Sequence, residues 1–269
     1  MSDFDLPGYD IIRNIFKGGM TDLYVAAAPS GQRVVIRMLK ELYVRERRIR
    51  RKFLHGARIL ARLNHPNIIR QIEYGHASRR PYMILEYVEA RTLRDLLIHR
   101  DPMLSQHILL LLRQMADALC YLHGRGYLHL DIKPENLLVA ADGHVTLVDF
   151  DLAVKCTHKP VRLKEYPGTP AYVAPEILTT QRADVRADIF SFGVTAYEML
   201  AFHKPFERNT LDESRIAQMD PAVPPTPLKI YCEHPPGCLV SLIGKCLAKD
   251  VNCRYPSMSL VIKHLEAIV

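Results

Sequence analysis

The sequence predicts an α+β fold in which a small, strand-rich N-terminal part precedes a larger, mainly helical C-terminal part. Residues 9–40 alternate between apolar and polar side chains as strands do, with turn signals at 17–19 (Lys-Gly-Gly) and 29–31 (Pro-Ser-Gly). After about residue 90 the pattern changes, and apolar residues recur at the spacing of a helix. Four segments show this helical spacing: 105–123, 186–201, 238–248 and 257–268.

The other N-terminal elements are predicted in the same way: a helix with a dense basic run over 43–62, and two strands over 67–74 and 81–87. The strand that includes residues 34–40, VVIRMLK, holds Arg37 among apolar neighbours. Burying a charge is costly unless an opposite charge meets it. The sequence therefore predicts an anionic partner for Arg37.

Composition limits the class of protein. Hydrophobic residues make up 48% of the 269 residues, which is enough for a substantial core. The net charge of +7 favours anionic ligands or partners without indicating nucleic acid. The six cysteines are spread through a chain that is too large to need disulfides, so we expect reduced thiols in a cytoplasmic protein. The longest apolar run, 108–112, is too short to cross a bilayer, and we expect neither a membrane nor a nucleic-acid partner.

The strongest chemical signal is the segment HLDIKPENLLV at 129–139, which places Asp131, Lys133 and Asn136 in one short loop. A second strand-like segment, HVTLVDF at 144–150, carries Asp149 at its end, before Phe150. Phosphoryl transfer needs positioning and charge neutralisation more than covalent chemistry. An aspartate can accept the proton of an attacking hydroxyl, and a lysine can neutralise charge on the phosphate. Asparagine and aspartate offer the hard oxygen ligands that magnesium prefers.

These two segments, followed by GTPAYVAPE at 168–176 and DVRADIFSFGVTAYEML at 184–200, resemble the eukaryotic-type protein kinase family in content and order. The resemblance covers nearly the whole chain, from the loop at 16–21 to Arg254. The Pro-Glu that follows Lys133, together with the Gly-Thr-Pro that opens the third segment, resembles the Ser/Thr class of the family.

The resemblance implies a bilobal fold with an N-lobe of five strands and one helix over 1–88 and a mainly helical C-lobe over 89–269. It also implies ATP and magnesium as cofactors and a protein substrate. The positions that match the family's functional residues are Asp131 and Lys133 for catalysis, Asn136 and Asp149 for the metal, and Gly18, Gly19, Leu23, Val35, Arg37, Glu86, Val88 and Leu138 for the nucleotide.

Three further matches imply supporting contacts in the larger lobe. Thr169 would bond near the catalytic aspartate and lysine. Glu176 and Arg254 would form an ion pair, and Asp188 would brace the backbone of the catalytic loop.

The phosphate grip departs from the family's pattern. The G-x-G-x-x-G loop has Phe16 and Thr21 in place of its first and third glycines, which limits how closely the backbone can approach phosphate. Arg37 replaces the strand lysine, and Gly56 stands where the following helix carries the partner glutamate. We therefore expect Arg37 to pair with Asp149 or with a bound phosphate.

Three more positions bear on this site. Lys40 is a poor substitute for the strand lysine, because a residue three positions along a strand faces the other side. The family's H-R-D has Leu130 in place of its arginine, so a phosphate on the activation segment has no basic dock and control by phosphorylation there is not expected. The family's D-F-G ends in Asp151, which adds negative charge near the metal ligand and stiffens a hinge.

These departures leave three functions open. The first is binding of ATP and magnesium with weak or absent phosphotransfer. The second is an active Ser/Thr kinase whose phosphate grip is Arg37 or Lys17. The third is a protein-binding module that needs no nucleotide.

Two other clusters each have a structural and a functional interpretation. The basic run at 44–52 is either a solvated helix face or a docking patch for an acidic protein partner. Cys232, His234 and Cys238 have ligand types that zinc takes, but no second tight pair of ligands follows them.

Overall fold

The computed structural model describes residues 6–157 and 159–268, with the backbone alone for Phe16 and Lys17. The chain forms two compact units. The first unit is Met1–Glu89 with Asp149–Asp151, and the second is Ala90–Val148 with Leu152–Val269. Asp149 and Phe150, which end the HVTLVDF segment, and the following Asp151 thus belong to the first unit, although the chain on either side of them belongs to the second.

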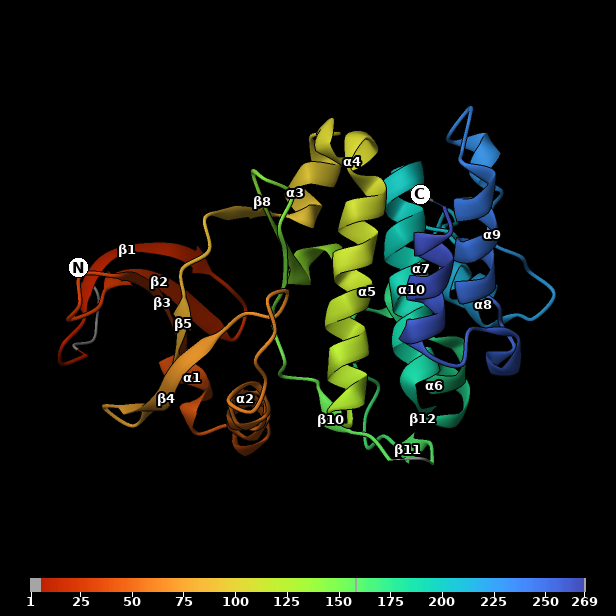
Figure 1. The fold of residues 1–269 in the computed structure, drawn as a ribbon. Helices are drawn as coiled ribbons and strands as arrows, with labels where there is room; N and C mark the ends of the chain where they lie inside the picture. Colours follow the sequence, from red (N-terminus) through yellow and green to blue (C-terminus); the bar gives the residue numbers. More distant parts are fainter. Residues whose placement is uncertain (1–5, 158, 269) are drawn as a thin grey trace. The chain divides into compact units, whose positions relative to one another are not determined.

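The first unit is built on a five-stranded antiparallel sheet in the order β1-β2-β3-β5-β4 (Figure 1). Its strands are β1 (Asp10–Lys17), β2 (Thr21–Ala27), β3 (Arg33–Leu39), β4 (Gln71–Ala77) and β5 (Arg80–Glu86). The first two hairpins close at the predicted turns. The N–H of Gly18 donates to the carbonyl of Thr21 at 3.0 Å, and the N–H of Gly31 donates to that of Ala28 at 2.8 Å.

Two boundaries in this unit differ from the prediction. The helix expected over 43–62 is two helices, α1 (Glu41–Val44) and α2 (Arg47–Leu60), because Glu46 has extended backbone between them. The strand expected over 67–74 begins only at Gln71, because the chain first makes a turn in which the N–H of Ile68 donates to the carbonyl of His65. The unit therefore has one short helix more than predicted.

The two faces of the sheet bury different residues. Even-numbered positions of β3 face one side, where Val34 and Ile36 belong to an apolar core. Odd-numbered positions face the other side, where Leu39 packs with Phe53 of α2 in a second core. Arg37 is on this second face, so α2 covers the side of the sheet that carries it.

The second unit is mainly helical and has short strands. Its α-helices are α3 (Leu93–Ile98), α4 (Met103–Gln106), α5 (Ile108–Gly124), α6 (Pro175–Thr180), α7 (Val185–Ala201), α8 (Leu211–Met219), α9 (Gly237–Cys246) and α10 (Met258–Glu266). Its strands are β6 (Ala90–Thr92), β7 (Tyr127–Leu128), β8 (Leu137–Ala140), β9 (Val145–Leu147), β10 (Val154–Lys155), β11 (Val161–Arg162) and β12 (Arg182–Ala183). Almost every residue of α7 is buried, and α7 contacts α5 and α9 (Figure 1). These elements confirm the predicted α+β class.

Two properties bear on the expectations from composition. All six cysteines carry free thiols. Across residues 6–157 and 159–268, no helix has both the length and the apolar content that crossing a membrane requires.

Candidate functional site

In the second unit, the side chain of Asp188 supports the backbone of the catalytic loop. The N–H groups of His129 and Leu130 donate to the two carboxylate oxygens of Asp188 at 2.9 Å each. Leu130 has a φ of 63°, in the left-handed region that costs a residue with a side chain about 1–3 kcal/mol. The two bonds hold it there, and they confirm the contact predicted for Asp188. Burial alone would raise the pKa of Asp188, but the bonds from His123 and from the loop backbone lower it and keep the carboxylate ionised.

Asp131 presents one carboxylate oxygen that the loop does not use. Its Oδ2 accepts from the side-chain amide of Asn136 at 2.9 Å and lies 3.0 Å from Nζ of Lys133. Its Oδ1 is buried and has no hydrogen-bond partner among the residues that the structure describes. Lys133 also donates to Thr169 at 2.9 Å, as the sequence predicts. A buried carboxylate oxygen without a donor is costly, so Oδ1 is the atom best placed to accept a hydroxyl proton.

Gly168 keeps the space next to this oxygen open. Its φ is 73°, which a glycine adopts without strain. A Cβ at this position would lie 2.9 Å from the carbonyl oxygen of Leu130 and 3.1 Å from Oδ1 of Asp131. The glycine of the GTPAYVAPE segment is therefore required by the close approach of that segment to the catalytic loop.

In the first unit, Arg37 meets two carboxylates. Its terminal nitrogens donate to both oxygens of Asp151 at 2.9 and 2.8 Å, and Nη2 lies 3.3 Å from Oδ1 of Asp149. The ring of Phe53 lies beside the guanidinium, with its centroid 5.4 Å from Cζ. The side chains of Arg37 and Asp151 are only 12% and 10% exposed. Burial disfavours the charged guanidinium, but the carboxylates of Asp149 and Asp151 outweigh it and raise the pKa of Arg37.

The main partner of Arg37 is one that sequence reasoning missed. The prediction named Asp149 or a phosphate, whereas the bidentate contact is with Asp151 and Asp149 is the second partner. A signal was available in the chain itself. Compared with the family's pattern, the helix lacks a carboxylate at Gly56 and the D-F-G segment has an additional one at Asp151. The number of carboxylates expected around the cation is therefore unchanged.

Gly56 is the third member of this arrangement. A Cβ on Gly56 would lie 2.8 Å from Oδ1 of Asp151, 2.9 Å from the carbonyl oxygen of Phe150 and 3.0 Å from Cα of Asp151. Any side chain at this position of α2 would therefore occupy the space that Asp151 and the backbone before it now fill. We therefore expect the departures at Arg37, Gly56 and Asp151 to form one exchange, in which the carboxylate beside the cation comes from the D-F-G segment instead of the helix.

Gly56→Ala should lower the free energy of unfolding by about 1–3 kcal/mol, because the added methyl must displace backbone or the ion pair. This loss is expected although alanine is the better helix former by about 1 kcal/mol. Gly244→Ala is the matched control, because Gly244 lies in α9 and an added Cβ meets no described atom within 4 Å outside its immediate surroundings. That variant should be more stable by up to about 1 kcal/mol. Urea denaturation followed by circular dichroism measures both, and a gain in both variants would contradict the packing described for Gly56.

The predicted nucleotide-binding residues of β2 and β3 share one face of the sheet. Leu23 is paired with Arg37, and Val35 lies two residues before Arg37 on the same strand. Leu85 is opposite Val35 in the register of β5 and so joins this face. The side chains of Leu23, Val35 and Leu85 form an apolar surface, and Arg37 adds one cation at its end.

The glycine loop is a tight hairpin that Lys40 supports. Nζ of Lys40 donates to the carbonyl oxygen of Gly18 and lies 3.7 Å from Asp22. Lys40 therefore fixes the loop that contains Gly18 and Gly19. The side chain of Lys17, the alternative phosphate grip, lies outside the described residues.

The remaining predicted positions lie in both units. Glu86 ends β5, and its N–H donates to the carbonyl of Arg70 at 3.0 Å. Val88 follows in the first unit, and Leu138 lies in β8 of the second unit. Contacts to a nucleotide at these positions stay a prediction.

The two positions predicted as metal ligands, Asn136 and Asp149, lie one in each unit. Asn136 uses its amide nitrogen to donate to Asp131, which leaves its amide oxygen for a metal. Asp149 supplies a carboxylate in the first unit. Over the described parts of the chain, no group of three or more His, Cys, Asp or Glu side chains is gathered as a metal site, and this includes the cluster at 232–238.

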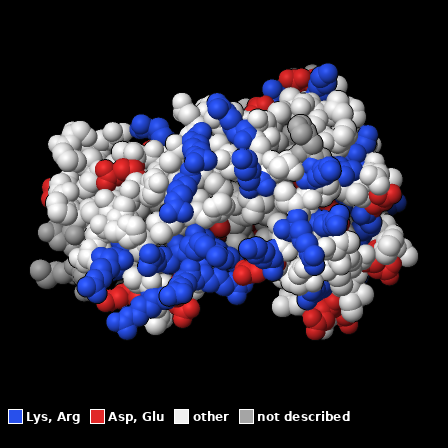
Figure 2. All heavy atoms as spheres, turned by 90° about the horizontal axis from the view of Figure 1, so that it is seen from below, with Lys and Arg blue, Asp and Glu red and all other residues white. Residues whose placement is uncertain are grey.

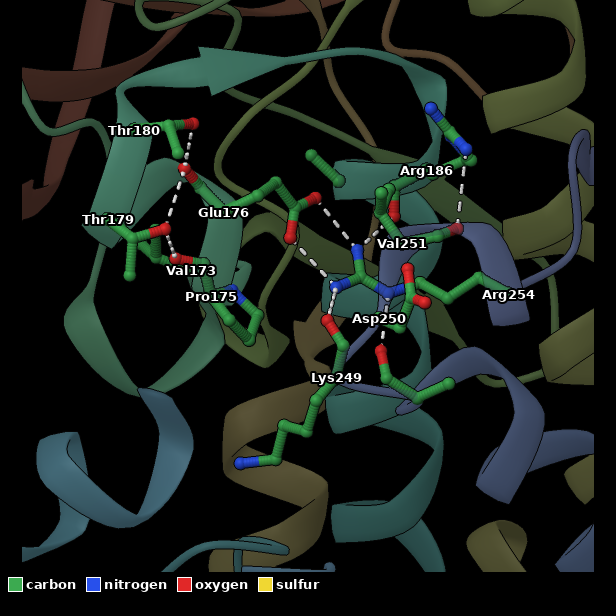
Figure 3. A network of polar contacts seen from close by, with 12 residues as sticks. Val173, Pro175, Glu176, Thr179, Thr180, Arg186, Lys249, Asp250, Val251 and Arg254 are labelled. Atoms are coloured by element: carbon green, nitrogen blue, oxygen red, sulfur yellow. Dashed lines mark hydrogen bonds and ion pairs between the residues drawn. The ribbon is translucent and has the colours of Figure 1, made fainter. Parts of the chain in front are cut away.

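Arg254 and Glu176 form the ion pair that the sequence predicts (Figure 3). The two terminal nitrogens of Arg254 donate to the two carboxylate oxygens of Glu176 at 2.8 Å each, and the Arg254 side chain is fully buried. Its guanidinium also donates to the carbonyls of Ala248, Arg186 and Lys249 at 2.7, 3.0 and 3.3 Å. The pair ties α6 to the segment that precedes α10.

Comparisons with known proteins agree on one family. The family model described as "Protein kinase domain" matches residues 9–265. The chain is 32% identical over 302 residues to serine/threonine-protein kinase PknD of Protochlamydia amoebophila, covering 98% of this chain and 30% of that protein. It is 32% identical over 266 residues to serine/threonine-protein kinase PknL of Mycobacterium tuberculosis, covering 97% of this chain and 65% of that protein. It is 30% identical over 261 residues to serine/threonine-protein kinase pkn2 of Myxococcus xanthus, covering 91% and 30%. The chain thus spans less than two thirds of the length of each relative.

Proposed function

Because this chain belongs to the protein kinase family, in its Ser/Thr class, we propose that it binds ATP with magnesium and transfers phosphate slowly to serine or threonine hydroxyls of a protein. One observation supports the proposal above all. The catalytic loop has its supporting contacts in place, whereas the cation at the phosphate-gripping position is held by Asp151. The first feature supports phosphotransfer, and the second supports a low rate.

The residues present suit both cofactors. Leu23 and Val35 offer adenine an apolar surface in the first unit, and Arg37 offers phosphate a cation beside it. Asn136 and Asp149 offer magnesium the small number of oxygen ligands that it takes from proteins. Bound magnesium would supply charge neutralisation at the phosphate oxygens.

The catalytic loop would act through Asp131 and Lys133, with Asp188 of α7 bracing its backbone. Asp131 would accept the hydroxyl proton at Oδ1, since Oδ2 is already engaged by Asn136 and Lys133. Lys133 would neutralise charge on the transferring phosphate from its place between Asp131 and Thr169. The bonds to Asp188 fix the loop in advance, so these groups need no rearrangement when substrate binds.

Arg37 is the reason to expect a low rate. Asp151 accepts hydrogen bonds from both terminal nitrogens of Arg37, and Oδ1 of Asp149 lies 3.3 Å from one of them. Removing one preorganised charge contact from an active site typically lowers the rate by about 10²–10³-fold. We therefore expect turnover well below the roughly 1–100 s⁻¹ that is typical of protein kinases.

Asp131→Asn is the direct test of phosphotransfer. The original chain should transfer labelled phosphate from ATP to generic Ser/Thr substrates at a low but measurable rate, and Asp131→Asn should abolish this transfer, because an amide cannot accept the proton. Both proteins should show the same rise in melting temperature with millimolar ATP and magnesium, because binding to the folded state stabilises it.

Four outcomes would point elsewhere. Transfer that persists in Asp131→Asn contradicts the role of Asp131, and ordinary kinase turnover favours an active enzyme gripping phosphate through Arg37 or Lys17. Stabilisation by ATP without any transfer favours a nucleotide-binding domain alone. If millimolar ATP gives no stabilisation, the chain is a protein-binding module that needs no nucleotide.

The names of the relatives support a protein substrate, and the free thiols support a cytoplasmic location. We extend both to this chain as part of the proposal.

A further inference from the structure

A hollow lined by arginines lies in the first unit, where α1 ends and α2 begins. Its volume is about 670 Å³, and it is open to solvent. The lining residues are Val44, Arg45, Arg47, Arg50, His76 and Arg79. Figure 2 shows lysine and arginine side chains gathered in a broad area of the surface in the region of α2. The hollow thus combines the start of the basic run at 44–52 with two residues of the β4–β5 hairpin.

The arginines of the hollow have no counter-ions in the described part of the protein. Arg45, Arg47, Arg50 and Arg79 are all exposed, and none forms an ion pair with a described residue. Glu46, the single acidic residue of the run, does not line the hollow. Like charges held this close repel one another, so the arrangement favours a bound anion.

The start of α2 adds to the positive potential. Its first turn contains no acidic residue and its N-cap makes no side-chain hydrogen bond. Arg47 and Arg50, one turn apart, therefore stand at the positive end of the helix dipole, where cations are unfavourable. A bound anion would relieve both the repulsion and the unfavourable placement.

Arg79 is held at the hollow by an unusual turn. Ser78 and Arg79 have φ values of 48° and 72° in the two-residue connection between β4 and β5. Such turns favour asparagine and glycine, which adopt positive φ more readily than serine or arginine. The hairpin thereby presents an arginine to the hollow from a second element, far along the chain from α2.

The shape of the site favours a phosphorylated side chain on a peptide. Guanidinium groups form paired hydrogen bonds with phosphate oxygens, and several of them from different elements can surround one phosphate. Val44 lines the hollow beside the arginines. This apolar side chain offers a peptide a contact beside the phosphate that an inorganic ion would not use.

We propose that the hollow lined by Arg45, Arg47, Arg50 and Arg79 binds a phosphorylated serine or threonine of a protein partner. This site is separate from the residues assigned to ATP and catalysis, and it requires no phosphotransfer by this chain.

The test uses the full chain and a mixture of fluorescently labelled peptides, each with one phosphoserine or phosphothreonine and random flanking residues. Binding is measured by fluorescence anisotropy at about 0.15 M salt. The phosphorylated mixture should bind at least about tenfold more tightly than its unphosphorylated counterpart. Arg47→Ala with Arg50→Ala should weaken binding by about tenfold or more. The matched control is Arg51→Ala with Arg58→Ala, which removes two exposed arginines of α2 that do not line the hollow and should change affinity less than about twofold.

Circular dichroism establishes that both double variants are folded. Equal losses in the two double variants would overturn the proposal, because binding would then follow net charge alone. Equal affinity for phosphorylated and unphosphorylated peptides, or no binding of either, would also overturn it. Phosphatidylserine vesicles and a short single-stranded RNA serve as further probes. Binding of either one that depends on Arg47 and Arg50, without phosphopeptide binding, would assign the hollow to a different class of partner and overturn the proposal.

Discussion

Replacing Arg254 with alanine should lower the free energy of unfolding by about 3–5 kcal/mol, which is the usual effect of breaking a buried ion pair from one side. Glu176 would lose its bidentate partner, and the carbonyls of Ala248, Arg186 and Lys249 would lose a donor. Arg254→Lys should recover only part of the loss, because an ammonium cannot reproduce the planar fork of a guanidinium. Urea denaturation followed by circular dichroism measures both variants.

Arg113→Ala is the control for this prediction, because it makes the same substitution in an exposed ion pair. Arg113 pairs with Asp117 and Glu266 on helices α5 and α10, and its side chain is 36% exposed. Exposed pairs of this kind contribute about 0–1 kcal/mol. If Arg254→Ala destabilised the protein no more than Arg113→Ala, the pair with Glu176 would not be the structural tie between α6 and the segment before α10.

The catalytic loop could be predicted closely because its residues are neighbours in the chain. The loop holds Asp131, Lys133 and Asn136 within the short stretch 131–136, so any compact path of its backbone brings them together. The bonds from the loop backbone to Asp188 and from Lys133 to Thr169 then depend on motifs whose order the sequence displays. The fold class could also be predicted, because the change from strand periodicity to helical periodicity extends over long segments of the chain.

The partner of Arg37 could not be predicted with the same certainty. Strand periodicity predicts which face Arg37 occupies, but not which carboxylate reaches it. That depends on the backbone of the D-F-G segment, where Asp149 has a φ of 63° that no residue pattern indicates. The hollow was out of reach for another reason. It joins Arg47 and its neighbours to Arg79, and only the folded hairpin brings these segments together.

Replacing Asp151 with alanine should destabilise the protein and weaken its response to ATP with magnesium. Arg37 would lose its bidentate partner, and since Asp149 remains 3.3 Å away, we expect a loss of about 2–3 kcal/mol, below the full effect of breaking a buried pair. Asp149 would then be the main counter-ion of Arg37 and less available to a metal. The rise in melting temperature caused by ATP with magnesium should therefore shrink, while the smaller rise caused by ATP with a chelator should change less.

Moving the carboxylate back to the helix tests whether the three departures form one exchange. Gly56→Glu alone should be strongly destabilising, because the new side chain meets Asp151 and the backbone of Phe150. Asp151→Gly alone should resemble the alanine variant. Together they remove the obstruction and return a carboxylate to Arg37 from α2, so the double variant should be more stable than the sum of the two losses predicts, by about 1–3 kcal/mol. Gly244→Glu with Asp151→Gly adds the same charge on α9, away from Arg37, and its effects should be additive. If the pair of changes at 56 and 151 were also additive, the two residues would not compete for one place beside Arg37, and the three departures would not form one exchange.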